Sequence, residues 1–145
     1  MRSLSRTAVG SLGLIALASA TATASCGSDE GAPAECTTFE PSCAPAYEPT
    51  FAQVFERTLK PSCGVSGRSC HAAEGHQGGL VYEDADQAHA LLLDRGVVKP
   101  GDAACSPLAL RITSTDKFRR MPPAGLLPAA EQCAVQTWIA NGARR

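Results

Sequence analysis

The sequence is poor in aromatic residues and has no cluster of basic ones. Phe, Trp and Tyr make up 5% of its 145 residues, and the formal net charge at pH 7 is −1. Proteins that bind nucleic acids usually carry a basic stripe, often with aromatic side chains that stack on bases. The pairs Arg119-Arg120 and Arg144-Arg145 are too short to form such a stripe, so no nucleic-acid partner is expected.

The sequence also lacks a hydrophobic run long enough to span a membrane comfortably. Its apolar stretch, residues 8–22, is shorter than the roughly 20 residues that a spanning helix needs. This stretch follows Arg2 and Arg6 and is rich in small residues, which is typical of an export signal. We therefore predict a signal peptide over residues 1–25.

Cys26 begins a polar, Gly-rich segment, and we interpret residues 26–45 as a flexible tether. A cysteine at such a junction is typical of bacterial lipoproteins, in which it carries the lipid. The alternative is an ordinary secretory signal cleaved near Ala24, with Cys26 as a disulfide partner. We favour lipidation of Cys26, which predicts a periplasmic protein of the cell envelope that is anchored to a membrane by lipid.

The seven cysteines are an odd number, which needs an explanation in an exported chain. Assigning Cys26 to lipid leaves six, which proximity along the chain divides into three local pairs. These pairs are Cys36 with Cys43, Cys63 with Cys70, and Cys105 with Cys133. So many cysteines in a chain of this size indicate an oxidising compartment, where disulfides persist.

Hydrophobic periodicity predicts a small all-α domain over residues 46–145, with about four helices and long loops. The expected helices span residues 50–59, residues 83–93, a segment that begins at Ser106-Pro107, and a segment from residue 128 to a Gly142 cap. Thr50 and Ser106 can cap their helices, and Pro107 suits a first helical position. Pro61 is expected to end the first helix, because a proline has no backbone N–H to donate.

The most informative motif combines Cys63 with the adjacent pair Cys70-His71, and Met121-Pro122-Pro123 follows fifty residues after His71. Two cysteines with a histidine directly after the second are how chains hold a covalently attached haem. Six residues separate the cysteines here, whereas the standard motif has two. The alternative is a Cys63–Cys70 disulfide, with His71 as an ordinary polar residue.

Other kinds of site find less support in the sequence. His71, His76 and His89 could bind zinc or copper together with nearby cysteines, but they lack a paired ligand spacing. No Gly-x-Ser-x-Gly or comparable nucleophile setting is present, so hydrolase activity is not expected. We expect no enzymatic activity from this chain.

The order of motifs from residue 51 to residue 143 resembles the small class I cytochrome c-like domains of exported bacterial proteins, including the planctomycete-type cytochrome C group. The motifs are Cys63 with Cys70-His71, Gly78-Gly79-Leu80, Pro100-Gly101-Asp102, Ser106-Pro107-Leu108, Met121-Pro122-Pro123, and the final Trp138-Ile139-Ala140-Asn141-Gly142-Ala143. The resemblance covers about two thirds of the chain. It implies that the first and last helices pack together, through Phe55 and Trp138.

The resemblance also implies a role for each residue of the haem motif. Cys63 and Cys70 would form thioethers to haem c, His71 would be the proximal iron ligand, and Met121 the distal one. Such a His/Met pair suits the transfer of single electrons rather than the activation of oxygen. The expected function is exported electron transfer to or from a periplasmic or membrane redox protein. The alternative is a haemless, disulfide-stapled domain that serves as a binding or structural module of the envelope.

Overall fold

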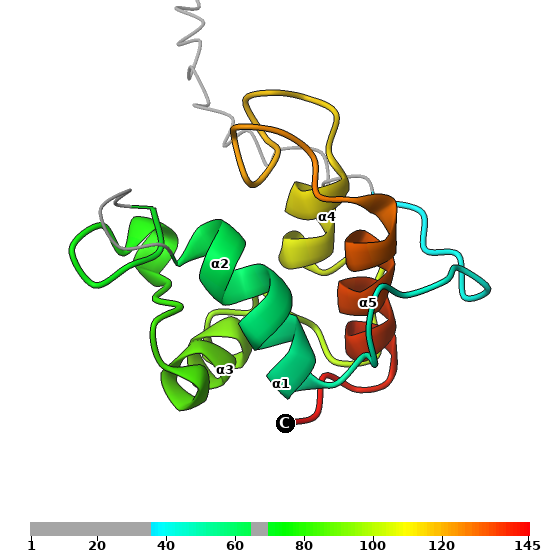
Figure 1. Cartoon of the computed structure of the whole chain (residues 1–145), viewed down its shortest axis with the longest axis horizontal. Coiled ribbons are helices and arrows are strands. Elements are labelled where there is room, and N and C mark those ends of the chain that lie inside the picture. The colour runs from blue at the N-terminus through cyan, green and yellow to red at the C-terminus, as the bar shows by residue number, and fades with distance from the viewer. Residues whose placement is uncertain (1–35, 65–69) are drawn as a thin grey trace, which may run out of the picture. The chain divides into compact units, whose positions relative to one another are not determined.

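The computed structural model describes residues 36–64 and 70–145 of the chain (Figure 1). The helices are α1 (Phe51–Val54), the π-helix η1 (Phe55–Leu59), α2 (Lys60–Cys63), the 3-10 turn η2 (Gln77–Gly79), α3 (Ala85–Asp94), α4 (Pro107–Thr113) and α5 (Ala129–Ala140). Because α1, η1 and α2 follow one another without a break, the domain has four principal helices. The described residues contain no strand, so the all-α prediction is confirmed.

The first helix begins as predicted, but it does not end at Pro61. The hydroxyl of Thr50 caps it by accepting a hydrogen bond from the N–H of Gln53, at 3.4 Å. In a regular α-helix Pro61 would leave one carbonyl without a donor, and its ring would collide with the preceding turn. The wider π-helical turn η1 lies directly before this proline, and such bulges occur where the hydrogen-bond ladder is interrupted. The helix therefore continues through α2 and carries Cys63 in its last turn.

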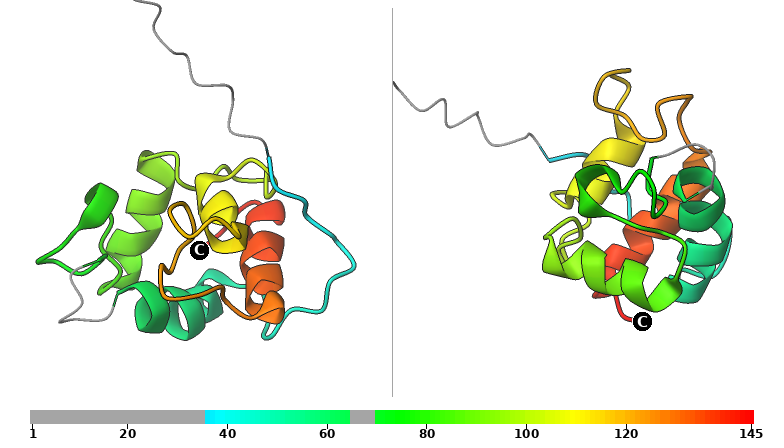
Figure 2. Two further views of the ribbon diagram at one scale, coloured as in Figure 1. Left: turned by 90° about the horizontal axis from the view of Figure 1, so that it is seen from above. Right: turned by 90° about the vertical axis from the view of Figure 1, so that its left-hand side faces the viewer.

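Helix α5 packs against both α1 and α4, as Figures 1 and 2 show. The predicted contact between the first and last helices forms, but through a different ring. Phe51 lies beside Trp138 with a centroid distance of 5.4 Å, whereas Phe55 lies one turn further along. The edge of His89 from α3 also contacts Phe51, at 4.7 Å between ring centroids. The buried rings of Phe51 and Trp138 and the half-buried ring of His89 thus join α1, α3 and α5.

Helix α4 begins at the predicted residue, but Ser106 does not cap it as predicted. Pro107 is the first helical residue, as expected. The hydroxyl of Ser106 makes no capping bond within the helix. It donates instead to the carbonyl of Asp102 at 2.7 Å and accepts from the N–H of Lys99 at 2.9 Å. The buried serine thus stabilises the turn before the helix.

The four cysteines predicted to form disulfides do so with different partners. Cys36 is bonded to Cys105, and Cys43 is bonded to Cys133. The local pairing that we predicted from proximity is therefore wrong. The bridges span 69 and 90 residues of sequence, so each connects the N-terminal segment to the C-terminal half of the domain.

Backbone hydrogen bonds show why the pairing is not local. The segment 36–46 runs beside the C-terminal half of the domain instead of folding on itself. The N–H of Thr37 donates to the carbonyl of Ala104 at 2.9 Å, and the N–H of Ala46 donates to that of Ala130 at 2.8 Å. Residues 36–45, which we expected to belong to the tether, have the irregular backbone expected of them but are fastened to the helices.

The remaining predictions for the N-terminus lie outside the described residues. These are the signal peptide over residues 1–25, the lipidation of Cys26 and the first part of the tether. Within the described ranges, none of the helices has the length and hydropathy needed to cross a bilayer.

Candidate functional site

A cavity of about 400 Å³ lies between the end of α2, the segment after it and the loop of residues 114–127. Its walls are formed by Pro61, Ser62, Cys63, Cys70, His71, Met121, Pro122, Pro123 and Ala124. The four residues that the resemblance assigns to haem therefore line the same cavity. Chain folding has brought them together from two segments that are fifty residues apart in sequence.

Backbone hydrogen bonds fix the segment that carries Cys70 and His71. The N–H of His71 donates to the carbonyl of Cys63 at 3.3 Å, which ties the histidine to the last turn of α2. The N–H of Gln77 donates to the carbonyl of Cys70 at 2.7 Å, and the N–H of Tyr82 donates to that of His71 at 2.8 Å. The Cys-His dipeptide is thus held from both sides, although it lies in a loop.

The His71 ring is half-buried and packs against the ring of Tyr82, with 5.1 Å between centroids. Burial lowers its pKa, and the nearby backbone of Gln77 and Leu80 opposes that shift. The neutral imidazole, which is the form that ligates metals, is therefore favoured. Its buried Nδ1 has no hydrogen-bond partner among the described residues. The ring lines the cavity, so the histidine lies where an axial iron ligand would be needed.

Cys63 and Cys70 are free thiols, so the alternative disulfide between them is not formed. Cys63 is half-buried, and burial raises its pKa to about 12, with a smaller contribution from the nearby Cys70. Cys70 is exposed. The other four cysteines within the described ranges are all bridged. The two cysteines of the motif are therefore the ones left available for another bond.

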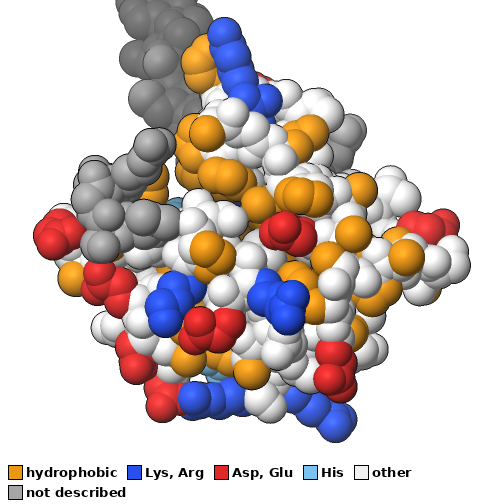
Figure 3. All heavy atoms as spheres, in the orientation of Figure 1, with side chains coloured by type: hydrophobic (Ala, Val, Ile, Leu, Met, Phe, Trp, Pro, Cys, Tyr) orange, Lys and Arg blue, Asp and Glu red, His pale blue; other side chains and the backbone are white. Residues whose placement is uncertain are grey.

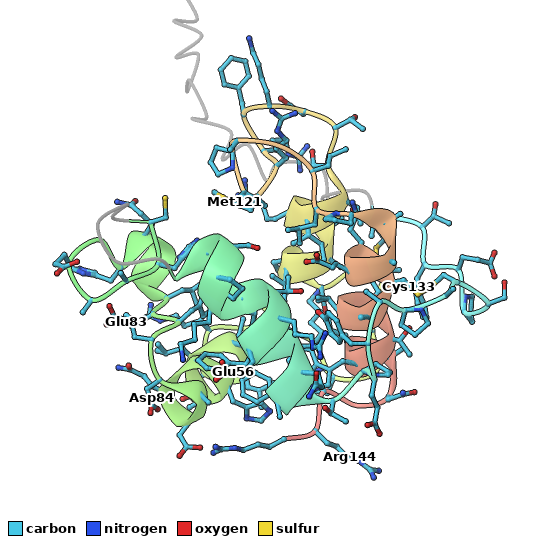
Figure 4. All side chains as sticks on the ribbon, viewed as in Figure 1. Glu56, Glu83, Asp84, Met121, Cys133 and Arg144 are labelled. Atoms are coloured by element: carbon cyan, nitrogen blue, oxygen red, sulfur yellow. A yellow bond between two sulfur atoms is a disulfide. The ribbon has the colours of Figure 1, made fainter. Side chains whose placement is uncertain are left out.

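Met121 lies in the loop that forms another wall of the cavity, and this loop is held by Arg111 of α4 and by Arg120 of the loop itself. The N–H of Met121 donates to the carbonyl of Arg111 at 2.8 Å, and the Arg111 guanidinium donates to the carbonyl of Arg119 at 3.1 Å. The guanidinium of Arg120 donates to the carbonyl of Pro123 at 3.1 Å. Figure 4 shows Met121 on the side of the loop nearest to α2. These bonds position the methionine at the cavity without a helix to carry it.

Sequence reasoning missed two residues that support His71. Tyr82 is buried against its ring, and burial raises the pKa of the tyrosine. Gly64 approaches Tyr82 so closely that a Cβ atom would lie 2.6 Å from the Tyr82 carbonyl oxygen. The signal that the sequence offers is the apolar run Leu80-Val81-Tyr82. It indicates a packed segment but not which ring that segment supports.

The close approach at Gly64 makes a testable prediction. Gly64→Ala will destabilise the domain by about 2 kcal/mol, because the added methyl group collides with backbone that cannot rotate away. Urea unfolding of the purified protein measures this change. Gly125→Ala is the matched control, since a Cβ atom there meets no atom within 4 Å, and it should change stability by less than about 0.5 kcal/mol. Equal effects of the two substitutions would contradict the packing described here.

The structure gives no support to a zinc or copper site. Within residues 36–64 and 70–145, no three His, Cys, Asp or Glu side chains are grouped so as to hold a metal ion. His89 Nε2 lies 2.9 Å from the carbonyl oxygen of Ala143, and His76 Nδ1 lies 3.1 Å from that of Ala73. His76 and His89, which lie outside the Cys-His motif, are thus both within hydrogen-bond distance of backbone carbonyls.

These features define a small, all-helical, disulfide-bonded domain whose cavity is lined by two free cysteines, a histidine and a methionine. The family model of planctomycete cytochrome C matches residues 68–125, so the resemblance to that family is confirmed over this segment. The matched segment includes Cys70, His71 and Met121, and it begins after Cys63. Searches of curated proteins and of solved structures gave no match. Two disulfides in a domain that matches this family over residues 68–125 indicate an extracytoplasmic location.

Proposed function

We propose that this protein is an exported electron carrier that holds one c-type haem. The observation that carries the proposal is the convergence of Cys63, Cys70, His71 and Met121 on a single cavity, with both thiols free. The match of residues 68–125 to a cytochrome C family supports it, because c-type cytochromes are typically electron carriers rather than enzymes.

The donor set suits this cofactor. Cys63 and Cys70 would hold the haem through thioethers, while the His71 imidazole and the Met121 thioether are the axial ligands of electron-transfer cytochromes. When bound, the haem supplies an iron that gains and loses a single electron. The prolines at 61, 122 and 123 give the cavity apolar walls, which limit the access of water to the site.

The partners and the location follow from this function. An electron carrier needs a donor and an acceptor, so we propose a periplasmic or membrane redox protein as its partner. We further propose that residues 1–25 are removed on export, that Cys26 receives a lipid, and that the following residues tether the domain to a membrane. Residues 46–145 carry the cavity and every helix of the described part of the chain, and they form the cytochrome c-like domain of this proposal.

The spacing of the two cysteines favours a second candidate function, a domain without haem. Six residues separate Cys63 from Cys70, and the family match begins after Cys63. Both observations favour a derivative that keeps the fold and its disulfides but carries no haem, and that serves as a binding or structural module of the envelope.

Intact-protein mass spectrometry distinguishes the two functions. The chain should be exported from a host that matures c-type cytochromes and purified without reducing agent. We expect a red protein with a sharp Soret band and a mass that exceeds the polypeptide mass by one haem. A colourless protein with a mass lowered only by two hydrogens per disulfide would favour the haemless module. The same spectrum also counts any lipid on Cys26.

Met121→Ala tests the distal ligand. The variant should keep its covalent haem, since both thioethers remain. Its reduction potential should fall on the order of 0.1 V, within the range of about 0.8 V over which axial ligands tune haem potentials. Potentiometric titration followed by absorbance measures the change. Leu126→Ala, an exposed position on the same loop, should leave the potential unaltered. An unchanged potential and axial spectrum in Met121→Ala would remove Met121 from the site.

A further inference from the structure

The loop of residues 114–127 carries the large hydrophobic side chains that the domain leaves exposed. Within the described ranges these are Phe118, which is 83% exposed, and Leu126, which is 46% exposed. The loop, yellow to orange in Figure 1, projects from the helical body, as the right-hand view of Figure 2 also shows. The space-filling view has hydrophobic and basic side chains together at this end of the molecule (Figure 3). An aromatic ring at the tip of a projecting loop contributes nothing to the core.

Basic residues surround the exposed ring. The Nζ atom of Lys117 lies 4.9 Å from the centroid of the Phe118 ring, Arg119 is exposed, and Arg120 is half-buried. Residues 114–127 contain three basic residues and one acid, which gives the loop a formal charge of +2. Because the whole chain has a net charge of −1, the rest of it carries −3. The loop is thus a positively charged segment of a chain that is otherwise acidic.

The base of this loop lies where the N-terminal segment joins the domain. The hydroxyl groups of Thr37 and Thr113 are 2.9 Å apart, and Thr113 is the last residue of α4 before the loop begins. Cys36 lies ten positions after Cys26, and even a fully extended chain of that length spans at most about 36 Å. A lipid on Cys26 would therefore keep this end of the domain close to a membrane surface.

We propose that residues 117–120, the loop tip, bind an anionic bilayer surface. Phe118 would insert at the interface, where aromatic rings are favoured, and the basic residues would bind lipid phosphates. A lipid chain combined with a basic patch is a recurrent form of two-point membrane attachment. An acidic protein surface would also bind the basic residues, but it would not explain the exposed aromatic ring of Phe118 between them.

This contact would also orient the candidate redox site. Met121 directly follows Arg120, so the wall of the cavity is contiguous with the loop tip. Binding of the tip to a membrane would hold the cavity near that membrane and favour a membrane-embedded redox partner. The argument rests on the proposed lipid at Cys26 but not on haem, so the contact can fail or succeed independently of the proposed electron transfer.

Vesicle binding tests the proposal on the mature chain carrying Cys26→Ser, which removes the lipid but keeps the tether. We expect binding to vesicles in which phosphatidylglycerol replaces half of the phosphatidylcholine, loss of that binding in high salt, and none to phosphatidylcholine alone. Phe118→Ala should weaken the binding about tenfold. Lys117→Gln together with Arg119→Gln should weaken the binding about 30-fold, since each of the two cations contributes to the attraction to an anionic surface.

Matched controls separate the loop tip from the general charge of the protein. Lys99→Gln with Arg144→Gln removes two exposed cations elsewhere, and Figure 4 shows Arg144 at the opposite end from Met121. This control should bind as the parent does. In Phe118→Trp, the tryptophan emission should shift to the blue on vesicle addition, because the new ring leaves water for the bilayer interface. Trp138 is already buried, so its emission should not contribute to the shift. If the parent fails to bind, or if Phe118→Ala binds as tightly as the parent, the membrane proposal is wrong and an acidic protein becomes the preferred partner of the cations.

Discussion

Replacing both Cys63 and Cys70 with serine will yield an exported protein that retains its helices and its two disulfides but carries no covalently bound haem. Neither thiol takes part in a disulfide, Cys70 is exposed, and Cys63 lies only at the edge of the core, so serine at both positions should preserve the fold. Both line the cavity beside His71, so the proposed function depends on them entirely. Intact mass after acid extraction of loosely held haem measures the result, and circular dichroism reports whether the helices remain.

The single variant Cys63→Ser tests whether Cys70 alone can hold the haem. Cys63→Ser should retain haem through Cys70, which lies inside the matched family segment and directly before His71. Ser62→Ala, which changes a neighbouring residue on the cavity wall, is the control and should keep the full haem mass. Covalent haem in the double variant would show that these thiols do not hold the cofactor.

Local signals in the sequence were sufficient to predict most of the fold. Thr50 and Pro107 each act within one helical turn, and both are found at the predicted helix starts. Pro61 shows the limit of such signals. A proline normally ends a helix, because its ring collides with the preceding turn. Here a wider π-helical turn precedes the proline and accommodates the ring, and no residue type in the sequence predicts such a turn.

The candidate site could be predicted in part because its residues belong to a compact motif. His71 follows Cys70 directly, and Met121 stands out in its Pro-Pro loop, so both were assigned before the structure placed them on one cavity. Tyr82 could not be assigned in this way. Its role depends on a ring contact with His71 and on the absence of a side chain at Gly64, and both are consequences of tertiary packing.

The disulfides could be predicted as a set but not as pairs. Proximity in sequence favours short loops, which cost the least entropy to close. The folded chain instead places Cys43 beside Cys133, because segment 36–46 runs along the C-terminal half of the domain. The path of an irregular segment is decided by what it packs against, and that information is spread over the whole domain.

The Cys43–Cys133 bridge should contribute a large part of the stability of the domain. Its cysteines are 90 positions apart, but with the Cys36–Cys105 bridge intact the loop that it closes is only about 35 residues long, so by the chain-entropy relation its removal should cost about 4 kcal/mol. That loss is comparable with the whole stability of many small domains. Cys43→Ala with Cys133→Ala should therefore shift the midpoint of urea unfolding far towards low denaturant. A loss below about 1 kcal/mol would contradict this role of the bridge.

A second double variant decides between the two pairings without any measurement of stability. Cys36→Ala with Cys43→Ala removes one partner from each observed bridge, so Cys105 and Cys133 should both become free thiols. Thiol titration under denaturing conditions should then count two more thiols than in the parent protein. If the pairing were local, the same variant would lose one bridge and leave Cys105 bonded to Cys133, so the count would not rise. The parent digested with trypsin without reduction should also give one assembly of three peptides, because residues 36 and 43 lie on the same tryptic peptide and are bonded to two others.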